Sequence, residues 1–343
     1  MSEFKPKPAA NSLRFMAIIF LALALIVVLI IATGIGSVAI PPGQVVAAVW
    51  HGISNNLVAV NDIIIWKIRL PRALLAALVG SLLSISGLAY QGIFRNPLAD
   101  PYLLGVASGA SFGAAFAIAF LPSIPLVASL GLPIISFLFS LLAVFLVVIF
   151  AVSNNKIPII NLILAGVVVG SSFSAGTSFI MITAKDRAVN ILAWLLGSFS
   201  LSSWAKLASV LPFYIIVLVL LMLSARALNL LQLGEEQAMQ LGLPVSSFKA
   251  VIIVLATLAT AAAVSVSGII GFVGLMVPHA ARLAFGPDHR VLIPVSALLG
   301  AIFLVLADLL ARTIISPEEI PIGIITALVG GPFFLYLLKK AEL

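Results

Sequence analysis

Residues 15–33 read FMAIIFLALALIVVLIIAT, a run of 19 residues without a charged side chain. Runs of this kind recur to the end of the chain, and charged residues stand almost only in the gaps between them. Hydrophobic residues make up 63% of the 343 residues and charged residues 8%, with a mean hydropathy of +1.29, so charges are too few to cover a water-soluble surface. A membrane barrel alternates apolar and polar residues, whereas these runs are apolar on every side. The sequence therefore predicts an all-α membrane protein.

Ten apolar runs have about the length that a helix needs to cross a bilayer, roughly 20 residues. They are expected at residues 15–35, 71–93, 103–121, 131–152, 158–182, 204–225, 249–267, 269–285, 291–311 and 321–338. A short external amphipathic segment is expected to end near residue 53, and an outer helix near residue 196. Because no long polar stretch separates the spans, residues 1–343 are predicted to form a single transmembrane domain.

The orientation follows from the positive charges, which favour the cytoplasmic side. With residues 1–14 in the cytoplasm, eleven Lys and Arg residues fall on the inner side and seven on the outer side. The even number of spans puts the C-terminus inside as well, with residues 226–248, the longest polar gap within the chain. Seven outer cations are many for this rule and indicate an external use. A cleavable signal peptide is the alternative for the first run, with residues 37–39 as a weak cleavage site.

A weak internal repeat appears at a shift of 181 residues. It aligns residues 84–87 (SISG) with residues 265–268 (SVSG), and Gly105 with Gly286. In the expected topology, spans two and seven point in opposite directions. The bundle is therefore predicted to contain an inverted internal repeat, an arrangement common among transporters.

A stripe of small residues follows span five at every fourth position: Gly166, Gly170, Ser174 and Ser178. Small residues at this spacing let another backbone come close, so one interpretation is simple helix packing. The other is that span five lines a wide path shared with a second subunit, because a smooth wall with few binding groups suits a bulky substrate.

The inner gap carries a short acidic stretch that begins with Glu235 and Glu236 and reaches Leu241 and Gly242. It is expected to form a helix lying beneath the membrane, with Ala238, Met239 and Leu241 as its apolar face. An ordinary loop is the alternative. The functional hypothesis is a docking element for a cytosolic partner that supplies energy.

Several chemistries find no support in the residues. The chain has no cysteine, no GxxxxGK[ST] and no HExxH, and its three histidines stand alone, so no catalytic, metal or nucleotide site of its own is expected. The basic residues are scattered singly, which argues against nucleic acid. A secondary transporter driven by an ion gradient is the main rival hypothesis. It predicts ionisable residues at mid-membrane depth, which nearly every span lacks.

Five segments together resemble the FecCD-type permeases, the membrane subunits of ABC importers for iron-siderophores, haem and cobalamin. They are RLPR at 69–72; SG at 86–87 with QGIFRNPLADP at 91–101 and LG at 104–105; LGEE at 233–236 with LG at 241–242; GFVGLMVPH at 271–279; and EIPIGIITA at 319–327. The resemblance covers almost the whole chain in the expected order. It implies a multi-pass protein of a bacterial or archaeal plasma membrane, with ten spans and no enzymatic activity of its own.

The resemblance also implies partners and sites. A second permease subunit completes a homo- or heterodimer, two cytosolic subunits bind ATP and Mg²⁺, and an external solute-binding protein delivers the substrate. Residues 235–242 then fall on the helices that contact the ATPase. Arg69, Arg72 and Arg312 fall on outer arginines that pair with glutamates of the binding protein. A ferric siderophore is the expected cargo, with haem or cobalamin next.

Overall fold

The computed structural model describes residues 11–36, 38–57, 59–121, 131–153 and 157–341, and these residues form helices and no β-strand. The first half consists of α1 (Asn11–Gly34), α2 (Pro42–Ile53), α3 (Val60–Ile64), the π-helix η1 (Ile65–Arg69), α4 (Leu70–Phe94), the 3-10 helix η2 (Pro101–Leu104), α5 (Val106–Phe120), α6 (Leu132–Ala151), α7 (Ile159–Thr183), the 3-10 turn η4 (Lys185–Arg187) and α8 (Ala188–Leu195). The second half consists of α9 (Trp204–Leu231), α10 (Glu235–Gln240), α11 (Val245–Ser267), α12 (Val273–Phe285), α13 (His289–Ala311) and α14 (Ile322–Ala341).

Each of the ten predicted spans coincides with a helix of the structure. Within the described ranges, seven helices are long and apolar enough to cross a membrane, and α5, α12 and α14 contribute three shorter apolar helices. The expected external helices are also present as α2 and α8. Of the predicted cytoplasmic N-terminus, residues 1–10 lie outside the described part, and α1 begins at Asn11.

Spans two and six extend furthest beyond the bounds that the sequence predicts. The helix of span two begins at Val60 rather than at residue 71, because one π-helical turn, η1, carries it through Arg69 to the start of α4. Pro71 does not break this helix, because it lies in the first turn of α4. Span six continues to Leu231, so much of the 226–248 segment belongs to the ends of α9 and α11.

Helix α4 forms the centre of the bundle and is buried along most of its length. Two hydrogen bonds show the direction of its neighbour α11: Ser86 bonds with Thr260, and Tyr90, further along α4, bonds with Thr257, which comes earlier on α11. Helix α11 therefore runs antiparallel to α4. Backbone contact is close, since a Cβ added to Gly87 would lie 1.7 Å from the carbonyl oxygen of Gly274. Glycine is therefore required where α12 crosses α4.

The internal repeat is present as a pattern of helices and not in the register that the sequence suggested. The lengths of α4, α5, α6 and α7 are 25, 15, 20 and 25 residues, and those of α11 to α14 are 23, 13, 23 and 20. The antiparallel α4 and α11 give the two halves opposite directions. The 181-residue shift is wrong, because Gly87 lies inside α4 whereas Gly268 follows the end of α11.

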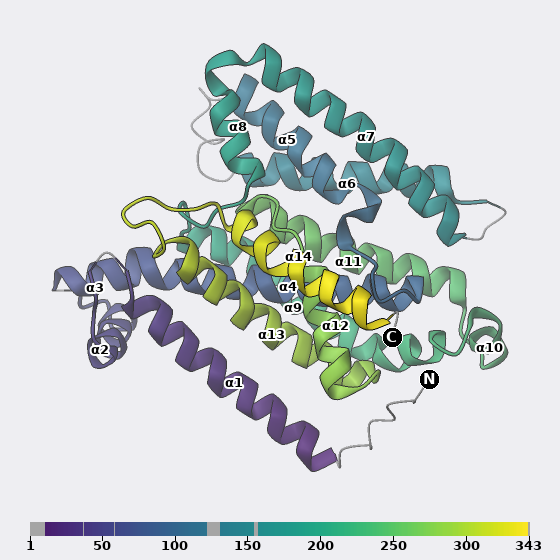
Figure 1. Ribbon diagram of the computed structural model, residues 1–343, viewed down its shortest axis with the longest axis horizontal. Coiled ribbons are helices and arrows are strands. Elements are labelled where there is room, and N and C mark those ends of the chain that lie inside the picture. The colour runs from purple at the N-terminus through teal and green to yellow at the C-terminus, as the bar shows by residue number, and fades with distance from the viewer. Residues whose placement is uncertain (1–10, 37, 58, 122–130, 154–156, 342–343) are drawn as a thin grey trace.

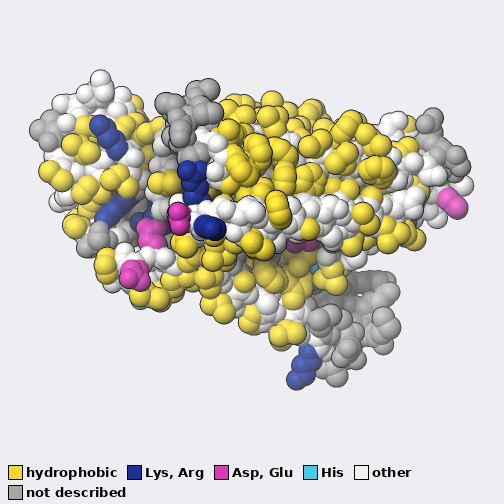
Figure 2. All heavy atoms as spheres, turned by 90° about the horizontal axis from the view of Figure 1, so that it is seen from above, with side chains coloured by type: hydrophobic (Ala, Val, Ile, Leu, Met, Phe, Trp, Pro, Cys, Tyr) yellow, Lys and Arg dark blue, Asp and Glu magenta, His cyan; other side chains and the backbone are white. Residues whose placement is uncertain are grey.

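Figure 1 shows the helices running between two opposite ends of the molecule. The start of α1, helix α10 and the end of α14 share one end, here called the α10 end. Helices α2, α3 and α8 mark the opposite end, here called the α2 end. Hydrophobic side chains cover most of the face in Figure 2, and its charged side chains gather mainly toward one end. This distribution fits a protein that spans a bilayer.

Candidate functional site

Helix α10 projects from the α10 end between α9 and α11. Its one buried residue, Ala238, packs in a small cluster with Leu231 and Val245. Met239 and Leu241 are instead 54% and 60% exposed. The predicted single apolar face of Ala238, Met239 and Leu241 is therefore wrong: Ala238 anchors the helix, and the other two point outward. Leu233, just before the helix, is 62% exposed and adds to this apolar surface.

Charge also ties α10 to the bundle. The Glu235 carboxylate lies 2.7 Å from Nζ of Lys249 on α11 and 3.9 Å from Arg95 after α4. Lys249 is buried, so it depends on this carboxylate for its charged partner. Glu236 is exposed. Gly242 has φ +86 with open space around it, so backbone conformation rather than crowding favours glycine where the chain leaves α10.

At the α2 end, Arg69 is bound inside the protein. Its guanidinium donates to the carbonyl oxygens of Thr33, Gly34 and Val38 at 3.2, 3.0 and 2.7 Å. Only 7% of the residue is exposed. The bonds to Thr33 and Gly34 satisfy carbonyls at the C-terminal end of α1, which that helix cannot satisfy itself. Arg69 thus fastens α1 to the start of α4.

Arg72 joins two acidic residues from distant parts of the chain. It donates two hydrogen bonds from Nε and Nη2 to Asp308 at about 3 Å, and two more to Glu319 at 2.6 and 3.1 Å. The Asp308 side chain is 3% exposed. The fork of the guanidinium explains why one arginine serves two carboxylates.

Arg312 completes this cluster. Its Nη2 donates to the carbonyl oxygen of Ala32, and its Nε lies 3.6 Å from the Asp308 carboxylate. Arg312 lies four positions after Asp308 on the same helix end, whereas Arg72, which binds Asp308 more closely, is 236 positions away. Burial lowers the pKa of Arg312, an effect that the negative charge of Asp308 partly offsets.

The small-residue stripe on α7 divides into a packed half and an open half. A Cβ on Gly166 would lie 2.1 Å from the carbonyl oxygen of Leu103, so this glycine lets α7 pack against η2. Gly170 has more room, with Ser108 Oγ at 3.4 Å from the same added atom. Ser174 and Ser178 are exposed in the single chain. The stripe therefore serves packing within the subunit at one end and offers a free surface at the other.

Sequence reasoning missed a polar cluster at the α10 end. Asp288 accepts a hydrogen bond from Asn229 at 2.7 Å and faces Arg14 at 3.7 Å, linking α9, α13 and α1. Burial alone would raise the pKa of Asp288, but the hydrogen bonds from Asn229 and from the Arg290 N–H, with nearby positive charge, lower it overall. No periodicity marks these residues, because they come from three separate segments.

Comparison with known proteins assigns this bundle to a class. The FecCD transport family model matches residues 24–340. A permease of Halobacterium salinarum named for cobalamin import is 46% identical over 82% of this chain and 74% of its own length. An ABC transporter permease of Bacillus subtilis, YvrB, is 44% identical over 92% of this chain and 91% of its own. Relatives at 38% and 34% identity are named for molybdate, hemin and iron(3+)-hydroxamate.

The fold agrees with this match. A solved structure described as an inward-facing metal-chelate type ABC transporter has a TM-score of 0.83 and 35% identity, and the match covers 95% of this chain and 99% of that one. The helical bundle is the membrane subunit of an ATP-binding cassette importer for metal chelates, a component without an ATPase site of its own. The chain belongs to the FecCD transport family. This membership decides against the ion-gradient alternative, and it implies a partner permease and ATPase subunits.

Proposed function

We propose that this subunit imports a bulky organic metal chelate and that cobalamin is the first candidate. The supporting observation is the 46% identity with a cobalamin permease. A ferric siderophore, which the motif resemblance alone favoured, is the second candidate, supported by the iron(3+)-hydroxamate relative that matches 95% of this chain. Haem is the third, by the same kind of likeness at 38% identity.

Uptake into proteoliposomes tests the substrate. The permease is reconstituted with its ATPase, and the binding protein is added outside with radiolabelled cobalamin, a ferric hydroxamate or haemin. ATP-dependent accumulation of cobalamin alone supports the first candidate. Accumulation of the ferric hydroxamate without cobalamin would transfer the assignment to the second. Transport in the absence of the ATPase would contradict the whole mechanism.

The exposed side chains of α10 support a coupling role. Leu233, Met239 and Leu241 form an apolar surface at a polar end, which suits a cleft on a partner protein. We assign the partner contact to these residues with Glu236 and Gly242, and the internal link to Glu235. ATP and Mg²⁺ would bind to that partner, so this chain needs no cofactor. Movement of α10 would reach α11 through the Glu235–Lys249 pair.

The open half of the α7 stripe supports a path between two subunits. Ser174 and Ser178 present small polar groups, and neighbouring side chains such as Phe179 and Ile182 are 68% and 78% exposed. A second permease subunit placed against this face would enclose a wall with few strong binding groups. The path would then open alternately at its two ends as the bundle changes between two states.

Docking of a solute-binding protein on Arg69, Arg72 and Arg312 remains a proposal with a structural condition. All three guanidinium groups have partners inside the subunit, so pairing with carboxylates of another protein requires them to exchange those partners. The ion pair of Arg72 with Glu319 is the easiest to exchange for one with another protein, because the Glu319 side chain is 38% exposed. With the α10 end in the cytoplasm, both termini would lie inside the cell, and the three arginines would face outward.

A further inference from the structure

A cavity of about 810 Å³ opens at the α2 end of the subunit. Its described walls come from α5, α6, η4, α8, residues 197–201, the start of α9, the end of α11 and the segment before α14. No described residue of α7 lines it. The cavity is thus separate from the α7 face assigned above to the transport path.

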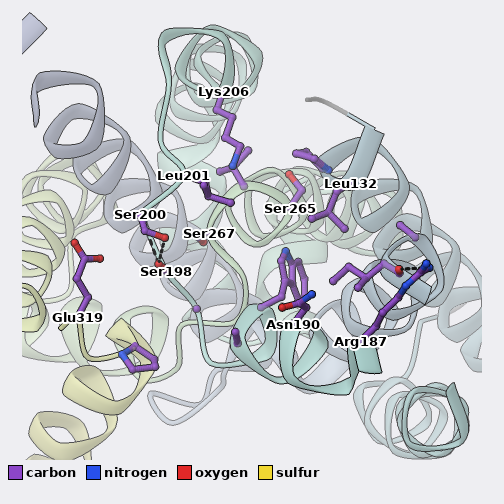
Figure 3. Close-up of a pocket in the computed structure, with 18 of the residues that line it drawn as sticks. Leu132, Arg187, Asn190, Ser198, Ser200, Leu201, Lys206, Ser265, Ser267 and Glu319 are labelled. Atoms are coloured by element: carbon purple, nitrogen blue, oxygen red, sulfur yellow. Dashed lines mark hydrogen bonds between the residues drawn. The ribbon is translucent and has the colours of Figure 1, made fainter. Parts of the chain in front are cut away.

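Three residues whose side chains carry nitrogen donors line this cavity: Lys206 with its ammonium group, Asn190 with its amide and Trp194 with its indole N–H. None of these side chains forms a hydrogen bond or ion pair with the residues described. In Figure 3, Lys206 extends toward the middle of the cavity from one side, and Asn190 lies on the opposite side. A ligand between them would meet donors from two directions.

The other charged side chains of the wall are committed elsewhere. Arg187 donates to the carbonyl oxygens of Ile118 and Ala119 at 3.2 and 2.5 Å, and in Figure 3 it points away from Lys206. The carboxylate of Glu319 is bound by Arg72. Among the described residues of the wall, Lys206 is therefore the charged side chain that has no partner.

The chemistry of the wall selects a ligand class. A cation with two neutral N–H donors matches an oxygen anion, because charge-assisted hydrogen bonds to a carboxylate or phosphate are the strong ones. Much of the remaining wall is apolar, including Leu132, Val266 and Ile320. A small hydrophilic anion would leave this surface wet, whereas a ligand with an apolar body would cover it.

We propose that this cavity binds an amphipathic organic anion, with its carboxylate or phosphate held by Lys206, Asn190 and Trp194. Such an anion has two sources: an anionic phospholipid of the surrounding bilayer, or a carboxylate-bearing chelate that arrives from the aqueous phase. The described walls of this site come from one subunit.

Lysine labelling of the reconstituted permease–ATPase complex distinguishes the sources. Lysines are methylated reductively in nanodiscs of phosphatidylcholine alone, with phosphatidylglycerol added, or with haemin added, and the modified residues are measured by mass spectrometry. Haemin carries two propionates on an apolar ring. We expect one of the two additions to protect Lys206, while the exposed Lys67 and Lys185 label equally in all three. Phosphatidylglycerol protection identifies a lipid site, and haemin protection identifies a chelate site.

Two outcomes overturn the proposal: equal labelling of Lys206 in all three discs, or protection of Lys206, Lys67 and Lys185 together, which would indicate unspecific charge effects. Substitutions provide a second readout. Lys206→Gln should weaken the protecting ligand by about tenfold or more, since one charge-assisted hydrogen bond is lost. The matched control Lys185→Gln should leave its affinity within about twofold. Equal affinity of the two variants would likewise contradict the site.

Discussion

Lys249 of α11 and Glu235 of α10 form an ion pair with 2.7 Å between Nζ and Oε1, and the Lys249 side chain is 3% exposed. A buried ammonium without a partner is costly, so this pair holds the short helix in one position against the bundle. Glu235 is thereby a positioning residue. The neighbouring Glu236, which is exposed, has no such role.

Glu235→Gln is expected to lower the free energy of unfolding by about 1–3 kcal/mol, because Lys249 keeps its charge and loses its closest charged partner. The thermal unfolding midpoint of the purified subunit measures this loss. Glu236→Gln is the matched control and should change stability by less than about 0.5 kcal/mol. The double variant Glu235→Gln with Lys249→Met should recover part of the loss. Equal midpoints for the two single Gln variants would contradict the positioning role.

Leu241→Asp is expected to release the ATPase without unfolding the permease. The side chain is 60% exposed, so the substitution removes an apolar contact with the partner and little packing within the subunit. Copurification of the ATPase with the tagged permease is the measurement, with the unfolding midpoint beside it. Ile315→Asp is the control at the α2 end, where the side chain is 55% exposed. Loss of the ATPase from both variants would refute α10 as the specific contact.

Arg72→Ala is expected to destabilise the subunit by about 3–5 kcal/mol, because it leaves Asp308 charged and buried. Adding Asp308→Asn should restore part of the stability. The docking hypothesis makes a different prediction, that affinity for the binding protein falls while the unfolding midpoint stays constant. Measuring both quantities on the same preparation decides between a structural and a docking role. The same pair of measurements on Arg69→Ala tests the anchor of α1.

Gly166→Ala and Gly170→Ala are expected to differ although both lie on one stripe. The new methyl at residue 166 would meet the Leu103 carbonyl oxygen at 2.1 Å, and backbone must move at a cost of about 1–3 kcal/mol. At residue 170 the nearest atom, Ser108 Oγ, is 3.4 Å away, and alanine favours the helix by up to about 1 kcal/mol. Unfolding midpoints check this order. A reversed order would show that α7 does not pack against η2 as described.

The fold class follows from the apolar runs alone, because long uncharged runs have one stable arrangement in lipid, the helix whose backbone hydrogen bonds are internal. The sequence also located α8 and α10 and supplied the family resemblance through motifs such as residues 86–105. Composition could not reveal where this span begins. Arg69, Pro71 and Arg72 are residues typical of the end of a span, but in the structure they lie inside one continuous helix from Val60 to Phe94.

The roles of the charged residues, in contrast, depend on how the helices pack. Arg72 and Asp308 meet because α4 and α13 pack side by side, and no local spacing announces a pair 236 positions apart. The cavity beside Lys206 likewise forms only where segments far apart in the sequence converge. The local sequence determines the hydrophobic periodicity and the length of each helix, because both depend only on neighbouring residues. The partners of a buried charge depend on which helices touch, and that is decided by packing across the whole bundle.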